Sequence, residues 1–250
     1  MLAPSFVPLT VSWNLTQRCN LACAHCYIEA TRGAADPEEL SAAEALGVLG
    51  QIAKVNSEAV LILTGGEPLL RRDIFDLISA AGAMGFWTVL GSHGGLLDEK
   101  VADRLVRAKL KGAGVSLDSI DAASHDRFRG IPGAWEKTVA ALAVMRTRAL
   151  PFLVEMTLTR DNRAELAAMA DFAIDSGAAA LNVFFLVPTG RGATLNDLSP
   201  AEYEESLVQL AQLQARHSGK LMINAKCAPH YRRVLWEIDH ASPFVRTFRG

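Results

Sequence analysis

Three of the four cysteines in this 250-residue chain, Cys19, Cys23 and Cys26, fall within eight positions. A disulfide framework spreads cysteines along a chain, so this clustering favours metal binding by thiolates. Three thiolates would serve three irons of a cubane iron–sulfur cluster and leave the last iron open to a small-molecule ligand. A zinc site is one alternative, although its fourth ligand, His25, directly precedes Cys26 and is awkwardly placed. Accidental clustering of structural thiols is another.

A second candidate site is the sequence LTGGEP at residues 63–68. Gly65 and Gly66 have no Cβ and therefore let the backbone approach a ligand closely. Glu67 offers acceptor oxygens, and Pro68 stiffens the exit from the loop. Such a loop suits a bound ammonium group, although GGEP is also compatible with an ordinary turn.

Strands and helices alternate in the expected secondary structure, as in a parallel sheet covered by helices. Strands are expected at residues 9–15, 59–63, 87–91, 114–117, 152–158 and 181–185. Helix starts are expected at Ser41 with Glu44, at Asp98, and at Ser199 to Glu202 with proline at the first helical position. The cysteine loop then follows the carboxyl end of the first strand, where active sites of α/β barrels collect. Residues 221–226 and 229–239 are expected to add a strand and a short helix.

Composition argues against several classes of function. The formal net charge is −2, from 25 basic and 27 acidic residues, so no strong field points to nucleic acid or an anionic membrane. The first residues lack the features of a signal peptide, and no apolar run approaches about 18 residues. We therefore expect one main domain in a soluble, cytoplasmic protein that acts on a small molecule or a peptide.

The C-x₃-C-x₂-C spacing followed by Tyr27 resembles the signature of the radical S-adenosylmethionine superfamily. The resemblance implies an α/β fold with a partial (β/α)₆ TIM-like barrel at residues 1–218. It also implies a [4Fe–4S] cluster on Cys19, Cys23 and Cys26, with S-adenosylmethionine on the open iron. The expected chemistry is formation of a 5′-deoxyadenosyl radical, with an electron from a donor such as ferredoxin or flavodoxin.

The same resemblance assigns further residues to the S-adenosylmethionine site: Tyr27, Gly65, Gly66, Glu67, Pro68, Ser92, Ser116 and Arg129. The segment VSLDSIDAASHDRFRG, residues 115–130, resembles the fourth-strand segment of the branch that often carries a SPASM domain. Ser116 would approach the ribose or carboxylate of S-adenosylmethionine, and Arg129 would pair with the methionyl carboxylate. A strand hydroxyl and a solvated charge are the plainer alternatives, and Asp118 is interpreted as structural.

Ser92-His93-Gly94 stands where the family usually has Thr-Asn-Gly. The hydroxyl is retained at Ser92, while His93 replaces an amide. We interpret His93 either as a proton donor near substrate or as a hydrogen-bonded structural histidine.

Residues 13–30, 184–207 and 226–233 resemble the tetrapyrrole-modifying enzymes of the heme d1 and alternative heme pathways. A tetrapyrrole is therefore the expected substrate, with Arg191 facing its carboxylate or a neighbouring loop. Two alternatives stay open: a peptide maturase acting on a ribosomal precursor, and a non-catalytic iron–sulfur or zinc-binding scaffold.

Members of this branch usually continue into a domain with auxiliary iron–sulfur clusters, whereas this sequence ends at Gly250. Residues 219–250 are accordingly expected to be a C-terminal extension, the start of a SPASM-like region in a chain that is either truncated or a minimal member. Cys227 is then either a first auxiliary ligand, completed in a longer form of the chain, or a buried thiol.

Overall fold

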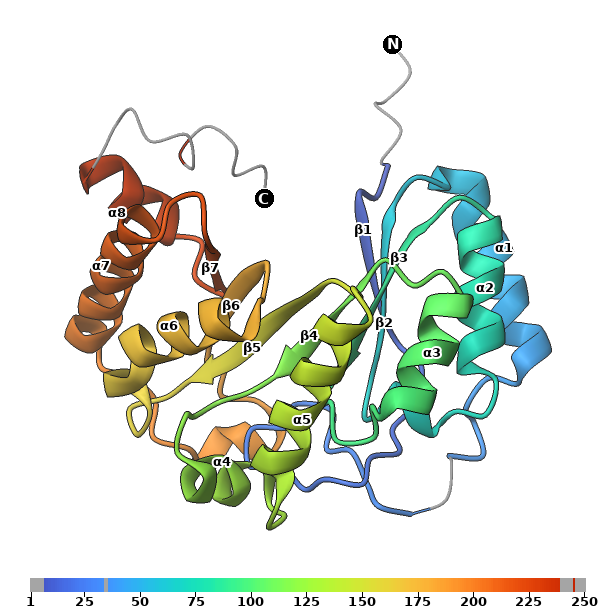
Figure 1. The fold of residues 1–250 in the computed structure, drawn as a ribbon, viewed down its shortest axis with the longest axis horizontal. Coiled ribbons are helices and arrows are strands. Elements are labelled where there is room, and N and C mark those ends of the chain that lie inside the picture. The colour runs from blue at the N-terminus through green and yellow to red at the C-terminus, as the bar shows by residue number, and fades with distance from the viewer. Residues whose placement is uncertain (1–6, 34–35, 239–244, 246–250) are drawn as a thin grey trace. The chain divides into compact units, whose positions relative to one another are not determined.

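Parallel strands alternate with helices along the chain in the computed structural model, which describes residues 7–33, 36–238 and 245 (Figure 1). The strands are β1 (Thr10–Asn14), β2 (Val60–Thr64), β3 (Trp87–Ser92), β4 (Gly112–Ser116), β5 (Phe152–Leu158), β6 (Ala180–Phe185) and β7 (Met222–Lys226). The α-helices are α1 (Ala42–Asn56), α2 (Ile74–Ala83), α3 (Glu99–Arg107), α4 (Ala122–Arg129), α5 (Ala134–Thr147), α6 (Leu166–Ser176), α7 (Pro200–Arg216) and α8 (Tyr231–Ile238). Three short 3₁₀ helices are η1 (Pro68–Leu70), η2 (Arg163–Glu165) and η3 (Gly190–Thr194).

The first of two compact units comprises the described parts of Met1–Ala22, Ile28–Val115 and Glu136–Phe152. Within it, β1 pairs with β2, β2 with β3, and β3 with β4, all in parallel. Leu61 and Leu63 of β2 are fully buried, as expected for a strand covered on both faces. Ser41 and Glu44 form a capping box at the start of α1, and Asp98 caps α3.

The second unit comprises the described parts of Cys23–Tyr27, Ser116–Trp135 and Leu153–Gly250. Strands β5, β6 and β7 pair in parallel and in that order. Helix α4 begins at its cap Asp121 and ends at Gly130, which adopts the left-handed conformation with φ of 72°. At α7, Ser199 and Glu202 form a capping box with Pro200 at the first position.

The expected strands are confirmed, with ends that shift by at most two residues. Strand β7 and helix α8 confirm the additional strand and the short helix near the C-terminus. Helix α4 was not predicted, because its residues were interpreted only through their resemblance to the family's segment around the fourth strand.

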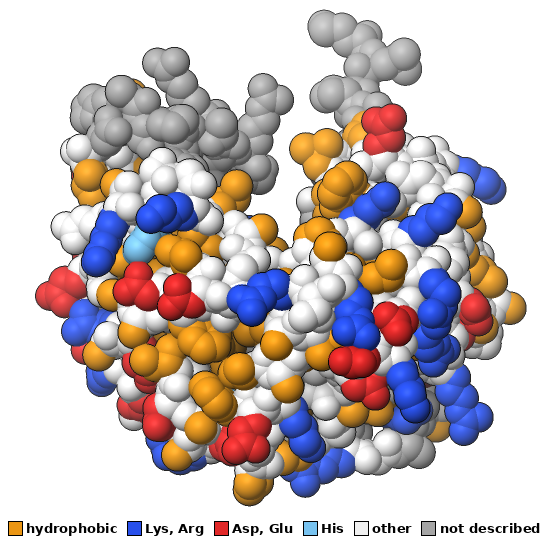
Figure 2. All heavy atoms as spheres, viewed as in Figure 1, with side chains coloured by type: hydrophobic (Ala, Val, Ile, Leu, Met, Phe, Trp, Pro, Cys, Tyr) orange, Lys and Arg blue, Asp and Glu red, His pale blue; other side chains and the backbone are white. Residues whose placement is uncertain are grey.

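The exposed surface carries both signs of charge. On the face in Figure 2, basic and acidic side chains are interspersed. No helix in the described part of the chain has the length and apolar character needed to span a bilayer.

Candidate cofactor site

Cys19 lies in the loop that follows β1, in the first unit. Its backbone N–H donates to the carbonyl of Thr31 at 2.8 Å, and the N–H of Leu21 lies 3.4 Å from its Sγ. The residue is buried, so both contacts fix the position of the thiol. This part of the loop is thus held by its own backbone.

Cys23 and Cys26 belong to the second unit, where helix α4 holds the loop between them. The N–H of Ala24 donates to the carbonyl of Phe128 at 2.8 Å, and the His25 ring stacks on the Phe128 ring with centroids 4.7 Å apart. Burial and then the charge of Arg129 lower the pKa of His25 to about 4. His25 is therefore a neutral packing residue at neutral pH.

The 3₁₀ helix η3 holds the same loop from another direction. Arg191 donates from Nε to the carbonyl of Cys23 at 2.9 Å and from its backbone N–H to the carbonyl of Cys26 at 3.1 Å. Gly190 has φ of 53°, and a Cβ there would lie 2.6 Å from the Cys26 carbonyl oxygen. Of the two expected roles for Arg191, contact with a neighbouring loop is the one the structure shows.

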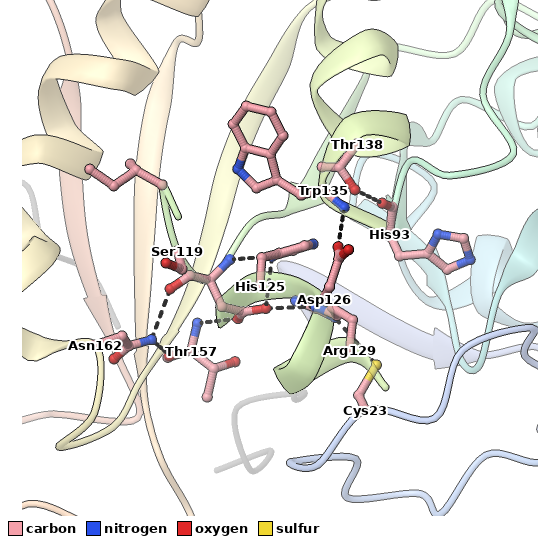
Figure 3. Close-up of polar contacts among 12 residues, drawn as sticks. Cys23, His93, Ser119, His125, Asp126, Arg129, Trp135, Thr138, Thr157 and Asn162 are labelled. Atoms are coloured by element: carbon pink, nitrogen blue, oxygen red, sulfur yellow. Dashed lines mark hydrogen bonds and ion pairs between the residues drawn. The ribbon is translucent and has the colours of Figure 1, made fainter. Parts of the chain in front are cut away.

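A buried ion pair lies beside Cys23 (Figure 3). The Nε of Arg129 donates to Oδ2 of Asp118 at 2.6 Å, and Nη1 of Arg129 lies 3.7 Å from Cys23 Sγ. The N–H of Thr157 donates to Oδ1 of Asp118 at 3.0 Å, and the Asp118 N–H donates to Nδ1 of His125 at 3.2 Å. Asp118 is therefore a structural residue that orients Arg129, and Arg129 faces a cysteine sulfur.

The ion pair keeps both partners charged. Burial is the largest single influence on the pKa of Asp118 and acts to raise it, but Arg129, then the two nearby histidines and the hydrogen bond from the Thr157 N–H, together lower it. Burial alone would lower the pKa of Arg129, whereas Asp118 and then Cys23 raise it. The buried positive charge of Arg129 therefore lies directly beside the sulfur of Cys23.

The glycines of the LTGGEP loop are required by the chain itself. A Cβ on Gly65 would lie 2.5 Å from the Thr16 carbonyl oxygen, and one on Gly66 would lie 2.2 Å from the Arg18 carbonyl oxygen. The N–H groups of Gly66 and Glu67 donate to these same two carbonyls, both at 2.7 Å. The close approach that excludes a side chain here is to the segment after β1, so the ammonium-binding role of the loop stays a prediction.

Glu67 is fully buried, and its carboxylate is a hub of hydrogen bonds. The Ser92 hydroxyl donates to it at 2.9 and 3.0 Å, and the backbone N–H of His93 donates at 3.1 Å. Glu67 also caps η1 by accepting from the N–H of Leu69, while Pro68 occupies the first position of that helix. These contacts fix Glu67 between the ends of β2 and β3.

His93 joins the LTGGEP loop to the cysteine loop. Its Nε2 lies 3.1 Å from Oε2 of Glu67 and 2.8 Å from Oδ1 of Asn20. The N–H of Gly95 donates to Nδ1 at 2.9 Å, so the proton of a neutral ring lies on Nε2. Thr138 donates to the His93 carbonyl at 2.9 Å. His93 is thus a hydrogen-bonded structural histidine, the second of its two expected roles.

The other expected site residues are placed as follows. Ser116 is half-buried and ends β4, while Tyr27 is 61% exposed beside η3. Cys227 is exposed, so its interpretation as a buried thiol is wrong. The first unit gathers Glu67, Ser92 and His93, and the second gathers Cys23, Asp118 and Arg129.

Within the described residues, no group of three or more His, Cys, Asp and Glu side chains is arranged to hold a metal ion. The donor chemistry nonetheless fits an iron–sulfur cluster. Of the three loop thiols, Cys19 and Cys23 are buried, and Cys23 faces a buried guanidinium that can balance the negative charge of a cluster.

These features define a class: an α/β protein with a thiol-rich loop after its first parallel strand. The family model of the radical SAM superfamily matches residues 13–173, and the chain belongs to this family of enzymes. An iron–sulfur cluster and S-adenosylmethionine are therefore its implied cofactors.

Relatives and solved structures agree with this assignment. An AdoMet-dependent heme synthase of Methanosarcina barkeri is 37% identical over 235 residues, which cover 94% of this chain and 66% of the relative. A pre-heme d1 synthase of Dinoroseobacter shibae is 38% identical over 183 residues, 73% of this chain and 44% of the relative. The crystal structure of Streptococcus suis SuiB bound to S-adenosylmethionine aligns with a TM-score of 0.76 at 16% identity, covering 98% of this chain and 56% of SuiB. The fold is therefore the partial TIM-like barrel that the sequence predicted, and the chain spans under two thirds of the length of these proteins.

Some polar residues of the second unit were missed by sequence reasoning. Glu155, Asn182 and Asn224 lie in β5, β6 and β7, in strands that were interpreted as apolar runs. The available signal was the alternation in β5, where Glu155 and Thr157 interrupt a series of apolar residues.

Proposed function

We propose that the protein is a radical S-adenosylmethionine enzyme that abstracts a hydrogen atom from a tetrapyrrole side chain. Cys19, Cys23 and Cys26 would each bind one iron of a [4Fe–4S] cluster, and the cofactor would occupy the last iron. The cluster supplies the electron that cleaves S-adenosylmethionine to a 5′-deoxyadenosyl radical. Membership of the superfamily supports the chemistry, and the heme synthase and pre-heme d1 synthase relatives support the substrate class.

The observation that carries the proposal is the contact between Arg129 and Cys23, with Nη1 lying 3.7 Å from Sγ. Asp118 occupies Nε of Arg129, so the terminal nitrogens are those available to a ligand carboxylate. A guanidinium beside a cluster cysteine is well placed for the methionyl carboxylate of a cofactor bound to the adjacent cluster. Tyr27 and Ser116 would make further contacts with S-adenosylmethionine in the second unit.

In the first unit, the LTGGEP loop would bind the methionyl amine. Because the Glu67 carboxylate is already held by Ser92 and His93, we assign it the role of fixing the loop. The backbone carbonyls of Gly65 and Gly66 are then the groups that would accept from the ammonium. Ser92 would support the loop indirectly, because its hydroxyl donates to the Glu67 carboxylate.

An exposed Cys227 directly after β7 is suited to a ligand in a following domain. We propose that residues 219–250 are the start of a SPASM-like region, and that Cys227 is the first ligand of an auxiliary cluster that a longer form of the chain would complete. The electron donor would be a ferredoxin or a flavodoxin.

The test uses coproporphyrin III, free or with iron, deuterated in its propionate side chains. The reconstituted protein is incubated anaerobically with S-adenosylmethionine and reductant, and 5′-deoxyadenosine is analysed by mass spectrometry. Deuterium in 5′-deoxyadenosine is the expected result. If 5′-deoxyadenosine forms but carries no deuterium with the free porphyrin and also none with the iron-bound porphyrin, the tetrapyrrole assignment is wrong. The radical chemistry would still be supported.

A further inference from the structure

A row of polar side chains crosses the three strands of the second unit. Glu155 of β5 is in register with Asn182 of β6, which is in register with Asn224 of β7. Nδ2 of Asn224 donates to Oδ1 of Asn182 at 3.0 Å, and the Asn182 side chain is hydrogen-bonded to Glu155. The three side chains therefore form one continuous polar row on one face of the sheet.

A second row lies two residues further toward the carboxyl ends of the strands. Thr157 is in register with Phe184, and Phe184 is in register with Lys226. Because side chains alternate between faces with a period of two, this row shares the face of Glu155, Asn182 and Asn224. The carboxyl ends of the strands are where active sites of barrel folds lie.

This face is the more open one. Val154, Met156 and Leu158 are fully buried on the opposite face of β5, whereas Glu155 and Thr157 keep some exposed surface. Helices α6 and α7 contact the sheet, and Figure 1 shows them on one side of β5–β7. Phe184, Asn224 and Lys226 are likewise half-buried, while Asn182 is buried between Glu155 and Asn224. The polar rows therefore lie on the face that can receive a ligand.

The charges on this face favour an anionic group. Burial raises the pKa of Glu155, so its carboxyl holds a proton to a higher pH than a solvated glutamate. Lys226 interacts electrostatically with Glu155 but forms no ion pair with any residue in the described part of the chain. A lysine, a carboxyl that resists ionisation and two amides form a site that is positive or neutral.

We propose that Lys226, Asn182 and Asn224 bind a carboxylate of the substrate, with Glu155 holding Asn182 in the row through their hydrogen bond and Phe184 packing against the substrate ring. This inference rests on the proposed function and names the substrate-binding residues. Lys226 gives the charge-assisted contact, and the amides give neutral hydrogen bonds. The hydrogen bonds within the row hold the amides in place, and Lys226 forms no ion pair within the described residues and is available to a ligand.

The experiment measures equilibrium binding of coproporphyrin III, a tetrapyrrole with propionate carboxylates, to the anaerobically reconstituted protein. Lys226→Met should raise the dissociation constant about tenfold to a hundredfold, the range for losing a hydrogen bond to a charged group. Lys226→Arg should retain most of the affinity because it keeps the charge. Asn182→Leu should weaken binding in the same direction as Lys226→Met.

Lys220→Met is the matched control, because Lys220 is exposed and precedes β7. It should bind within about twofold of wild type. Far-UV circular dichroism and iron content check that each variant is folded. Absence of binding by wild type, or equal affinity in Lys226→Met and Lys220→Met, would overturn the inference. Formation of 5′-deoxyadenosine is also measured without porphyrin. This second assay distinguishes failure of the radical chemistry from failure of substrate binding.

Discussion

The guanidinium of Arg129 donates to the carboxylate of Asp118 at 2.6 Å, and both residues are buried. The two lie eleven residues apart, at the start and the end of the segment that contains α4. The pair therefore fixes the end of α4 against the strand segment that precedes it. The same guanidinium faces Cys23, so the fold of this segment and the surroundings of the Cys23 sulfur both depend on Arg129.

Removing the charge of Asp118 should destabilise the protein. Asp118→Asn leaves a buried guanidinium without its counter-charge, and the free energy of unfolding should fall by about 3–5 kcal/mol. Urea unfolding followed by circular dichroism measures the change. Asp161→Asn, at an exposed position of the same unit, should change it by no more than about 0.5 kcal/mol. A loss below about 1 kcal/mol in Asp118→Asn would contradict a structural role for the pair.

Arg129→Lys separates charge from geometry. Lysine keeps a positive charge near Asp118 but cannot bind a carboxylate through two parallel hydrogen bonds. We expect normal iron content and S-adenosylmethionine affinity weakened about tenfold, with a larger loss of affinity in Arg129→Ala. Isothermal titration of the reconstituted variants gives the affinities. Wild-type affinity in both variants would remove Arg129 from the cofactor site.

His93→Ala should loosen the LTGGEP loop. It deletes the ring that bridges Glu67 and Asn20, and the lost hydrogen bonds, one to a charged group, should lower the free energy of unfolding by about 2–3 kcal/mol. Affinity for S-adenosylmethionine should fall while iron content stays near wild type. His93→Asn, which restores the residue usual in the family, should recover part of both losses. Unchanged cofactor affinity in a folded His93→Ala protein would show that this bridge does not serve the cofactor.

The pKa of Glu155 predicts a pH-dependent stability. In the folded protein burial raises this pKa above the ordinary value of 4.5, although Asn182, Arg129 and Lys226 act to lower it and Asp118 acts to raise it further. The folded state therefore binds the proton more tightly, and its stability falls as the pH rises from the ordinary value through the raised one. Glu155→Gln removes this loss, so its stability relative to wild type should be greater at about pH 8 than at about pH 4. If the difference in free energy of unfolding between Glu155→Gln and wild type were the same at both pH values, or favoured the variant more at the lower pH, the pKa of Glu155 would not be raised.

Cys227 should be dispensable for the cluster of the cysteine loop. The residue is exposed and lies about two hundred positions further along the chain. Cys227→Ala should keep the iron content of wild type after reconstitution, as measured by a colorimetric iron assay. Loss of most of the iron would make Cys227 a ligand of the same cluster.

Secondary structure was predictable because local signals agreed with the final fold. Apolar runs of strand length and the capping residues Ser41, Asp98 and Ser199 placed the elements within a few residues of their observed positions. Helix α4 was harder to predict, because its buried residues are His125 and Arg129. The helix therefore lacks the apolar stripe by which a helix is recognised in a sequence.

The sequence named candidate site residues but did not indicate which neighbours each of them would contact. The spacing of the cysteines pointed to metal, whereas nothing local indicated that His93 would bridge Glu67 and Asn20. The need for glycine at position 66 was recognised, but the neighbour that requires it is the Arg18 backbone, 48 positions earlier in the chain. Such contacts depend on tertiary packing, which a single sequence does not specify locally.

The proposed function requires that the three loop cysteines hold a cluster that cleaves S-adenosylmethionine. Its most direct test is the yield of 5′-deoxyadenosine from protein reconstituted anaerobically with iron and sulfide and then given dithionite and S-adenosylmethionine. Wild type should bind about four irons and form 5′-deoxyadenosine, while Cys19→Ala, Cys23→Ala and Cys26→Ala should each form none. Formation of 5′-deoxyadenosine by any of these variants at the wild-type rate, or its absence from fully loaded wild type, would contradict the account.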